Sequence, residues 1–252
     1  MHPIHTLIRV AGLLALLQGP AARAVDGYVP ARGAWETRSP AEVRMDAGGL
    51  ERAVELHRRH ESPRPRDQEL AQMQTFGREP LGKGIGPFGV RGDVSGLVLR
   101  HGYLVREWGD THAVEMTHSV TKSFLSTVVG VAWSDGRLRL DEPVHRSMAP
   151  VPLPAGDGEA GVDRTAFGGP DPTLLFTTPR HRRITWDHLL RQSSDWAGTL
   201  WGKPDWADRP TGEPDTWRTR ERHEPGAVHE YNDTRVNLLA LAATSLLRRP
   251  LP

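Results

Sequence analysis

The sequence contains no cysteine among its 252 residues. This absence excludes disulfide frameworks, zinc sites built from thiolates and cysteine nucleophiles. Neither sign of charge is in excess, because 32 lysine and arginine residues face 31 aspartate and glutamate residues, so no net field favours a nucleic acid or an acidic membrane as a partner. With 37% hydrophobic and 25% charged residues, the chain is typical of a soluble globular protein and unlike a disordered chain or a membrane bundle.

Lysine is scarce, since only Lys83, Lys122 and Lys203 occur among the 32 basic residues. Arginine stays protonated in proteins, whereas lysine gives up its proton near neutral pH in a suitably tuned site. In a chain so rich in arginine, a retained lysine is therefore a candidate for a chemical role that arginine cannot fill.

Long hydrophobic runs are absent apart from one near the N-terminus, Val10–Leu17. This run follows a basic segment and precedes Ala22-Arg23-Ala24, which has the A-x-A form of a signal cleavage site. It is far shorter than the roughly 20 residues that span a bilayer. We therefore expect residues 1–24 to be a signal peptide and residues 25–252 to be an exported domain, periplasmic or secreted, without a transmembrane segment. The alternative is a buried N-terminal helix, which Gly19-Pro20 would break.

Apolar periodicity and turn residues predict one hairpin and several helices. The strands Ser95–Val98 and Tyr103–Trp108 flank a turn at His101-Gly102. Helices are predicted from Asp46 to Leu56, over Ser119–Ser134 with Asp135-Gly136 as the stop, over Ile184–Gln192 with Thr185 as N-cap, and over Asp233–Leu247. Gly- and Pro-rich loops are predicted over residues 61–92, 149–183 and 197–226. A hairpin followed by helices and long loops indicates an α+β fold with an antiparallel sheet.

Two of these helices have a predicted apolar face. In the helix that starts at Ser119, the face comprises Phe124, Leu125, Val128 and Ala132. In the last helix it comprises Val236, Leu239, Ala240 and Ala243. We expect both faces to be buried.

A hydroxyl and an amine lie three residues apart at the start of the first of these helices. At that spacing Ser119 and Lys122 share one helix face and can form a hydrogen bond. The helix N-terminus adds positive potential and free N–H groups, which favour an alkoxide or an acyl oxyanion. A serine hydroxyl is a weak nucleophile that needs such an activator. The pair therefore indicates a catalytic serine, and the alternative is an ordinary N-cap serine beside a solvated lysine.

A second polar segment precedes the last predicted helix. A Pro225-Gly226 turn leads to the run Tyr231–Asp233, which places a phenol and an amide just before an apolar helix. The run holds one of the three tyrosines of the chain. It is a candidate for a polar site that faces a groove, and the alternative is a half-buried tyrosine beside a residue, Asn232 or Asp233, that caps the helix.

Four stretches of the chain, in sequence order, carry a wider pattern. They are Met116–Phe124 around the serine, Gly136–Val144 after its helix, Ile184–Ser194 and Pro225–Asp233. Together they resemble the serine β-lactamase and penicillin-binding-protein-like hydrolases, especially the class C-like branch that includes esterases and D-aminopeptidases. The third stretch is similar to the family's iTirhLLtHtSG run and the fourth to its PG..f.YSN run. The resemblance covers roughly residues 90–250. Several motifs that match in the family's order make a specific signal, whereas any single one of these motifs does not.

The resemblance implies roles for the candidate residues. Ser119 would be the nucleophile that becomes acylated, Lys122 its electrostatic partner, and Tyr231 the proton shuttle to the leaving group and later to water. The family writes Tyr-x-Asn, whereas Asp233 stands at the third position here. A carboxylate near Lys122 would favour the charged ammonium, which leaves Tyr231 as the better candidate for the general base. Asp233 and Asn232 are thus predicted to be supporting residues.

The resemblance also implies a fold and a gap in it. The fold is β-lactamase/transpeptidase-like, with an antiparallel sheet flanked by helices and a helical subdomain. The family's third motif, Lys-Thr-Gly or a His-x-Gly variant, lies on a late strand many tens of residues after the tyrosine, whereas the sequence ends soon after Tyr231. We therefore expect a domain truncated at its C-terminus, without its last strands, its third motif and its second oxyanion N–H.

The predicted function is that of an exported serine hydrolase, which cleaves an amide or ester bond of a small molecule or peptide through an acyl-enzyme on Ser119. Two alternatives stay open: a catalytically silent binding protein of the same fold, and a non-functional fragment. We expect no cofactor and no metal, because His57 and His60 flank two arginines and no H-E-x-x-H motif occurs. The five tryptophans between Trp186 and Trp217 are better explained by core packing than by an apolar wall for substrate.

Removal of the signal peptide is directly testable. Mature protein purified from its native host should begin at Val25 or within a few residues of it, because the A-x-A site ends at Ala24. Intact-mass spectrometry of the exported protein measures this start. Recovery of soluble cytosolic protein that retains Met1 would contradict the prediction.

Overall fold

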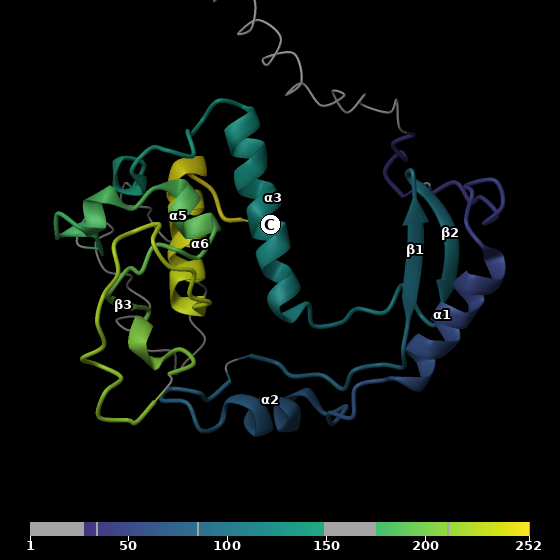
Figure 1. Ribbon diagram of the computed structural model, residues 1–252, viewed down its shortest axis with the longest axis horizontal. Helices are drawn as coiled ribbons and strands as arrows, with labels where there is room; N and C mark the ends of the chain where they lie inside the picture. Colours follow the sequence, from purple (N-terminus) through teal and green to yellow (C-terminus); the bar gives the residue numbers. More distant parts are fainter. Residues whose placement is uncertain (1–27, 34, 85, 149–174, 211, 252) are drawn as a thin grey trace, which may run out of the picture. The chain divides into compact units, whose positions relative to one another are not determined.

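The computed structural model describes residues 28–33, 35–84, 86–148, 175–210 and 212–251 (Figure 1). These residues form two compact units. The hairpin unit comprises the described part of Met1–Arg64 together with Gly92–Val114, and the helical unit comprises the described parts of Pro65–Arg91 and Glu115–Pro252. The predicted signal peptide, residues 1–24, and most of the loop predicted over 149–183 lie outside the described residues.

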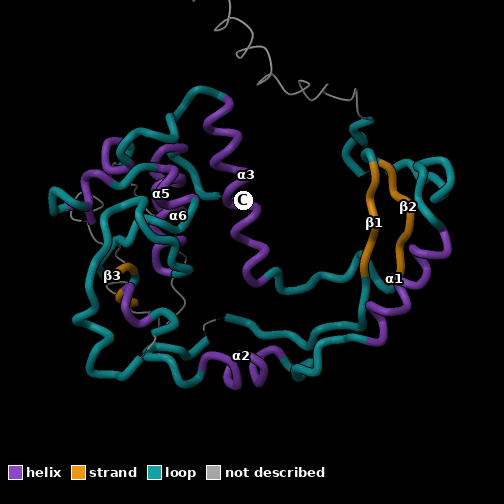
Figure 2. The backbone as a smooth tube through the Cα atoms, in the orientation of Figure 1, coloured by secondary structure: helices purple, strands orange, loops and turns teal. Residues whose placement is uncertain are grey.

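Helices and small antiparallel sheets make up the two units (Figure 2). The hairpin unit holds α1 (Ala47–Arg59), β1 (Gly96–Arg100) and β2 (Tyr103–Trp108). The helical unit holds α2 (Gln68–Phe76), α3 (Thr121–Ser134), α5 (Trp186–Leu190), α6 (Asp233–Leu247), β3 (Thr199–Leu200) and β4 (Lys203–Pro204). This mixture of elements fits the α+β class that the sequence predicts.

The hairpin forms where the sequence predicts it. Strand β1 pairs antiparallel with β2, and the turn residues His101 and Gly102 have φ angles of 53° and 85°. Gly102 takes this left-handed conformation without a steric penalty. A further segment joins the pair, because Thr37 bridges Leu104 in parallel.

Helix α1 packs against the hairpin through a small apolar core. Asp46 caps its first turn by accepting a hydrogen bond from a backbone amide at 3.0 Å. Leu50 and Val54 are buried, and Leu50 belongs to the same core as Val105 of β2. Leu56, which the sequence places on this face, is 52% exposed, because it lies only two positions beyond Val54 and is turned away.

Helix α3 begins two residues after its predicted start, since a 3-10 turn over His118–Val120 precedes it. Its buried stripe consists of Leu125, Val129 and Ala132. Spacings of four and three residues keep these side chains on one helix face. The prediction for Phe124 is wrong: its side chain is 61% exposed, because one residue before Leu125 is a rotation of about 100° around the helix.

Asp135 and Gly136 end α3 in a Schellman motif, as the sequence predicts. The amide of Gly136 donates to the carbonyl of Trp133 at 3.0 Å, and the amide of Arg137 donates to that of Ala132 at 2.9 Å. Gly136 has a φ of 70°, in the region that side chains other than glycine rarely adopt.

The loop predicted over residues 61–92 is wrong in part, because α2 lies within it. Asp67 caps this helix by accepting a hydrogen bond from the amide of Leu70 at 3.0 Å, and Gly77 ends it. Good helix formers fill the nine residues between, but the Pro, Gly and Arg on either side outweigh them when composition is averaged over the whole stretch. Likewise β3 and β4 pair inside the loop predicted over 197–226.

Helices α3 and α5 pack against α6 and enclose the main core of the helical unit (Figure 1). Helix α6 spans its predicted range, but Val236 and Ala240 lie at the margin of the core and are only partly buried. Trp186 and Trp196 are fully buried, which supports core packing for these two tryptophans. The apolar residues of α6 that are buried are Leu238, Leu239, Ala242 and Ala243.

A buried cluster of charges joins the start of α6 to the loops around it. Arg235, whose side chain is 1% exposed, lies 2.8 Å from Asp195 and 3.2 Å from Asp205. Burial opposes the ionisation of Asp195, but the backbone amide of His223 and the guanidinium of Arg235 hold its pKa below its ordinary value. The other cations that pair with Asp195 are Arg180, Arg220 and Arg222.

Replacing Arg235 with methionine should destabilise the helical unit by about 3 kcal/mol, because the remaining buried charges would lose a partner. Urea unfolding followed by circular dichroism measures the change. The matched control is Arg191→Met, whose ion pair lies on the surface with the arginine 73% exposed; its effect should stay below about 0.5 kcal/mol. Equal stability of the two variants would contradict the prediction.

Candidate active site

Ser119 lies in the 3-10 turn that leads into α3. A hydrogen bond from the amide of Val120 to the carbonyl of Thr117, at 2.9 Å, holds this turn. The preceding residue, His118, has a φ of 44°, and its Nε2 lies 3.0 Å from Gln68 Oε1 of α2. Ser119 therefore stands at the positive end of a helix, where backbone amides and the helix dipole stabilise negative charge.

The Pro-Gly turn docks the tyrosine segment beside the stretch that follows α5. The amide of Gly226 donates to the carbonyl of Ser193 at 2.8 Å, and the amide of Glu230 donates to that of Gln192 at 2.9 Å. Gly226 has a φ of 92°, and a Cβ at this position would lie 2.8 Å from a neighbouring histidine ring, so the turn requires glycine. Backbone hydrogen bonds thus join two motifs that are separate in the sequence.

Asn232 is the N-cap of α6 and is 2% exposed. Its Oδ1 accepts a hydrogen bond from the amide of Arg235 at 3.0 Å, and its Nδ2 donates to the carbonyl of Asp205 at 2.9 Å. Its own amide donates to Gln192 Oε1 at 2.9 Å. These contacts are structural, so Asn232 supports the site by placing its two neighbours in the chain.

The structure brings Ser119, Lys122 and Tyr231 together. Ser119 Oγ lies 2.7 Å from the Tyr231 hydroxyl and 3.0 Å from Lys122 Nζ. An ammonium group only donates hydrogen bonds, so Ser119 Oγ accepts from Lys122 and keeps its own proton for a second partner. Tyr231 lies at the right distance to be that partner. This arrangement suits transfer of the serine proton to the phenol oxygen.

Asp233 supplies a counter-charge to the lysine, with Oδ1 2.7 Å from Lys122 Nζ. Burial disfavours the charged form of Lys122, but the hydrogen bonds and charges of Asp233 and Tyr231 outweigh it and raise the pKa of Lys122. Burial likewise opposes the ionisation of Asp233, but Lys122 and Arg209 outweigh it and lower the pKa of Asp233. At neutral pH the pair is therefore ammonium and carboxylate.

Arg209 is a site residue that cannot be recognised from the sequence. Its Nη1 lies 2.9 Å from Asp233 Oδ2, and its guanidinium carbon lies 4.5 Å from the centre of the Tyr231 ring. It belongs to the stretch predicted as a loop over 197–226, in a chain with many arginines. No local sequence pattern distinguishes Arg209 from the other arginines. Its position beside the start of α6 becomes evident only in the folded structure.

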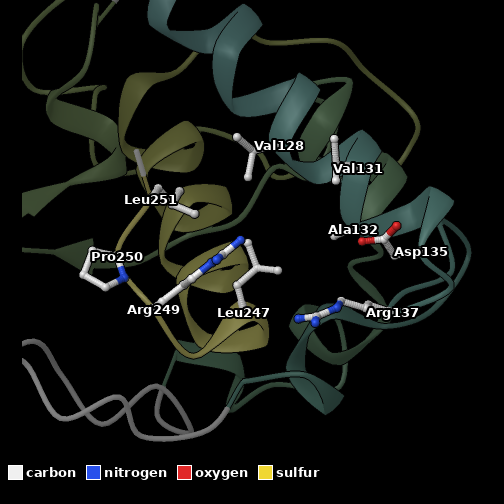
Figure 3. A pocket seen from close by; sticks show the side chains of 9 residues that line it. All are labelled: Val128, Val131, Ala132, Asp135, Arg137, Leu247, Arg249, Pro250 and Leu251. Carbon is white, nitrogen blue, oxygen red and sulfur yellow. The ribbon is translucent and has the colours of Figure 1, made fainter.

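A pocket of about 460 Å³ extends from the charged pair along the groove between α3 and α6. Lys122 and Asp233 line its polar end, and Phe124 and Val236 are among its apolar residues. Figure 3 shows a neighbouring pocket of about 420 Å³ farther along the same two helices, where Val128, Val131 and Ala132 face Leu247, Arg249, Pro250 and Leu251. The lining of this second pocket does not include the serine, lysine or tyrosine of the site.

Another pocket, of about 610 Å³, borders Tyr231 on the side of the 197–226 stretch. Trp206 and Trp217 form part of its wall, together with Arg209. These two tryptophans therefore line a pocket, and core packing does not account for them. Of the five tryptophans, Trp186 and Trp196 therefore fit the predicted core packing, Trp206 and Trp217 line a pocket, and Trp201 is 39% exposed.

Within the described ranges, no three or more His, Asp or Glu side chains gather in a way that could hold a metal ion. His57 instead packs edge-on against Trp108, with ring centres 5.5 Å apart. Among the helices of the described residues, none has the length and apolar character to cross a membrane.

The sequence also matches a known family. A family model described as Beta-lactamase matches residues 97–251, which include the hairpin, α3 and α6. No match was found among curated proteins or among solved structures. Because the family model spans more than half of the chain, including Ser119, Lys122 and Tyr231, the chain belongs to the Beta-lactamase family.

Proposed function

We propose that the chain is a serine hydrolase that cleaves an amide or ester bond through an acyl-enzyme on Ser119. The observation that carries the proposal is that Ser119 Oγ lies within hydrogen-bond distance of both Lys122 Nζ and the Tyr231 hydroxyl. A serine held by an amine and a phenol at a helix N-terminus has the surroundings of an activated nucleophile. Membership of the Beta-lactamase family supports hydrolase chemistry.

In the first step, Ser119 Oγ attacks the carbonyl carbon of the substrate, and its proton passes to the Tyr231 oxygen while the hydroxyl proton of Tyr231 passes to the leaving amine or alcohol. The substrate oxygen takes up negative charge, which the Lys122 ammonium and the backbone amides at the start of α3 stabilise. The bond between the carbonyl carbon and the leaving group then breaks as the carbonyl re-forms. The products are an ester on Ser119 and the released amine or alcohol.

In the second step, water replaces the leaving group. It attacks the acyl carbon and gives a proton to the Tyr231 oxygen, while the hydroxyl proton of Tyr231 passes to Ser119 Oγ as the ester bond breaks. The two steps together add one water across the original bond. Lys122 keeps its proton throughout, because Asp233 favours the charged ammonium, and this is why proton transfer is assigned to Tyr231.

The substrate in this proposal is a small-molecule or peptide amide or ester, a class that includes peptides, β-lactams and simple esters. The pocket lined by Lys122 and the pocket lined by Tyr231 both combine apolar walls with charged groups. The apolar walls include Phe124 and Val236 in the first and Trp206 and Trp217 in the second. Such mixed surfaces suit an organic acyl group better than an inorganic ion. From the N-terminal sequence alone, we further propose that the protein is exported.

Ser119→Ala should abolish covalent labelling by a fluorophosphonate while the fold stays intact, because the phosphorus of this probe bonds to an activated serine oxygen. Intact-mass spectrometry measures the label, and circular dichroism measures the fold. Ser134→Ala is the control, since this serine is the last residue of α3 and its hydroxyl donates to the local backbone, at the carbonyl of Val131. Labelling of Ser119→Ala at the parent's level would exclude Ser119, and a parent that takes no label would indicate a silent binding protein.

Asp233→Asn should lower the pKa of Lys122, because the amide keeps the shape of the side chain but removes the carboxylate that favours the ammonium. The chain has only three lysines, so 13C-methylated lysine resonances can be followed individually against pH. Lys83 and Lys203 serve as internal controls. An unchanged titration of Lys122 would show that Asp233 does not set its charge.

A second readout of the same variant is stability against pH. Because the pKa of Asp233 lies below its ordinary value, its ion pairs stabilise the fold above the unfolded-state pKa of about 3.9, and that stabilisation is lost as the pH falls through the folded-state pKa. Asp233→Asn should be less stable than the parent near neutral pH, and the difference should shrink toward about pH 3. Urea unfolding at both pH values measures it, and a constant difference would count against this assignment.

A further inference from the structure

The stretch between β4 and α6 carries a cation, Arg209, that contacts two residues of the site, Tyr231 and Asp233. We infer that Arg209 is a positioning residue, which fixes the ring of Tyr231 and the carboxylate of Asp233 in the orientation that proton transfer needs. The inference rests on the proposed function, because these are the groups assigned there to proton transfer and charge.

The guanidinium of Arg209 contacts two aromatic rings. Its carbon lies 4.5 Å from the centre of the Tyr231 ring and 5.4 Å from that of Phe76 at the end of α2, both within the range of cation–π attraction. A planar guanidinium can lie flat on a ring, which the compact ammonium of lysine cannot. Since Lys122 Nζ lies 4.9 Å from the same Tyr231 centre, the tyrosine ring is held by two cations from different elements.

Asp233 connects these two cations. Its Oδ1 lies 2.7 Å from Lys122 Nζ, and its Oδ2 lies 2.9 Å from Arg209 Nη1. Because each carboxylate oxygen has its own cation, rotation of the carboxylate about its Cβ–Cγ bond is restricted. A neutral residue at position 209 would free one oxygen and let the carboxylate turn toward other donors.

Asp208 holds Arg209 in place from a buried position. Its Oδ2 accepts a hydrogen bond from the amide of Asp233 at 2.5 Å and lies 3.5 Å from Arg209 Nη1. Its Oδ1 pairs with Lys203 at 2.9 Å, and its side chain is 2% exposed. Arg209 has a φ of 46°, a conformation that side chains other than glycine adopt only when their surroundings hold them. The contacts of Asp208 provide that support and tie the stretch to the start of α6.

A fixed tyrosine matters for the chemistry, because proton transfer uses the 2.7 Å contact between the Tyr231 hydroxyl and Ser119 Oγ. A misplacement of about 1 Å in such an alignment slows a reaction by about a hundredfold. Arg209 has no described contact with Ser119, so it acts through Tyr231 and Asp233. Its loss should slow the bond-forming step and leave the binding of a small probe nearly unchanged.

The test measures fluorophosphonate labelling of Ser119 in Arg209→Gln and Arg209→Lys. We expect the maximal labelling rate of Arg209→Gln to fall about ten- to a hundredfold, with little change in the half-saturating probe concentration. Arg209→Lys should be intermediate, because it keeps the charge beside Asp233 but loses the planar contact. Arg218→Gln is the matched control and should label like the parent: this arginine lies on the same stretch and stacks on Trp206, 4.7 Å from its ring centre.

Chemical rescue separates positioning from a general loss of fold. In Arg209→Ala, added guanidinium chloride should restore part of the labelling rate beyond what sodium chloride does at equal ionic strength, because the free cation can occupy the vacated place. Equal effects of the two salts, or parent-like labelling of Arg209→Gln while Ser119→Ala stays unlabelled, would overturn the inference and leave the proposed function intact. A parent that takes no label at Ser119 would overturn both.

Discussion

The buried guanidinium of Arg235 is the interaction on which the rest of the helical unit depends. It lies against the carboxylates of Asp195 and Asp205 and donates to the carbonyl of Trp196 at 3.0 Å. The three segments that meet there are the end of the α5 stretch, the residues after β4 and the first turn of α6. A buried charge is tolerated only while it is paired, so none of these segments can shift alone. Backbone hydrogen bonds join the stretch that carries Tyr231 to the residues after α5. The position of Tyr231 therefore depends on the charge cluster around Arg235.

Within the site, the carboxylate of Asp233 determines how the neighbouring charges are arranged. Asp233 stands where the family resemblance leads one to expect an amide, and it pairs with both Lys122 and Arg209. An amide there would leave the lysine freer to exchange its proton, whereas the carboxylate favours the charged ammonium. In the proposed mechanism, the lysine therefore acts through its charge and its donated hydrogen bonds, and proton transfer is assigned to the phenol.

What could be predicted from the sequence is what local spacing determines. The hairpin, the Schellman end of α3 and the pairing of Ser119 with Lys122 each depend on residues a few positions apart, where periodicity and turn chemistry are informative. The contact of Ser119 with Tyr231 spans 112 positions, and the family resemblance alone pointed to it. Arg209 and Arg235 have partners 24 and 40 residues away, and neither a motif nor a composition signal accompanies them. The sequence does not predict the short α2, because its flanks dominate the local composition. The predicted apolar face of α3 is wrong at Phe124, which lies one residue of rotation away from the buried stripe.

Asp195 has a φ of 41°, a left-handed conformation that suits glycine, and it occupies the position where the family's iTirhLLtHtSG run ends in glycine. The side chain bears that strain but pairs with four arginines at once. With those arginines in place, a change of Asp195 to glycine would relieve the backbone and yet leave several guanidinium groups crowded together with one counter-charge fewer. The backbone conformation at position 195 and the arginines around it therefore constrain each other: glycine would suit this position only if some of the arginines were replaced as well.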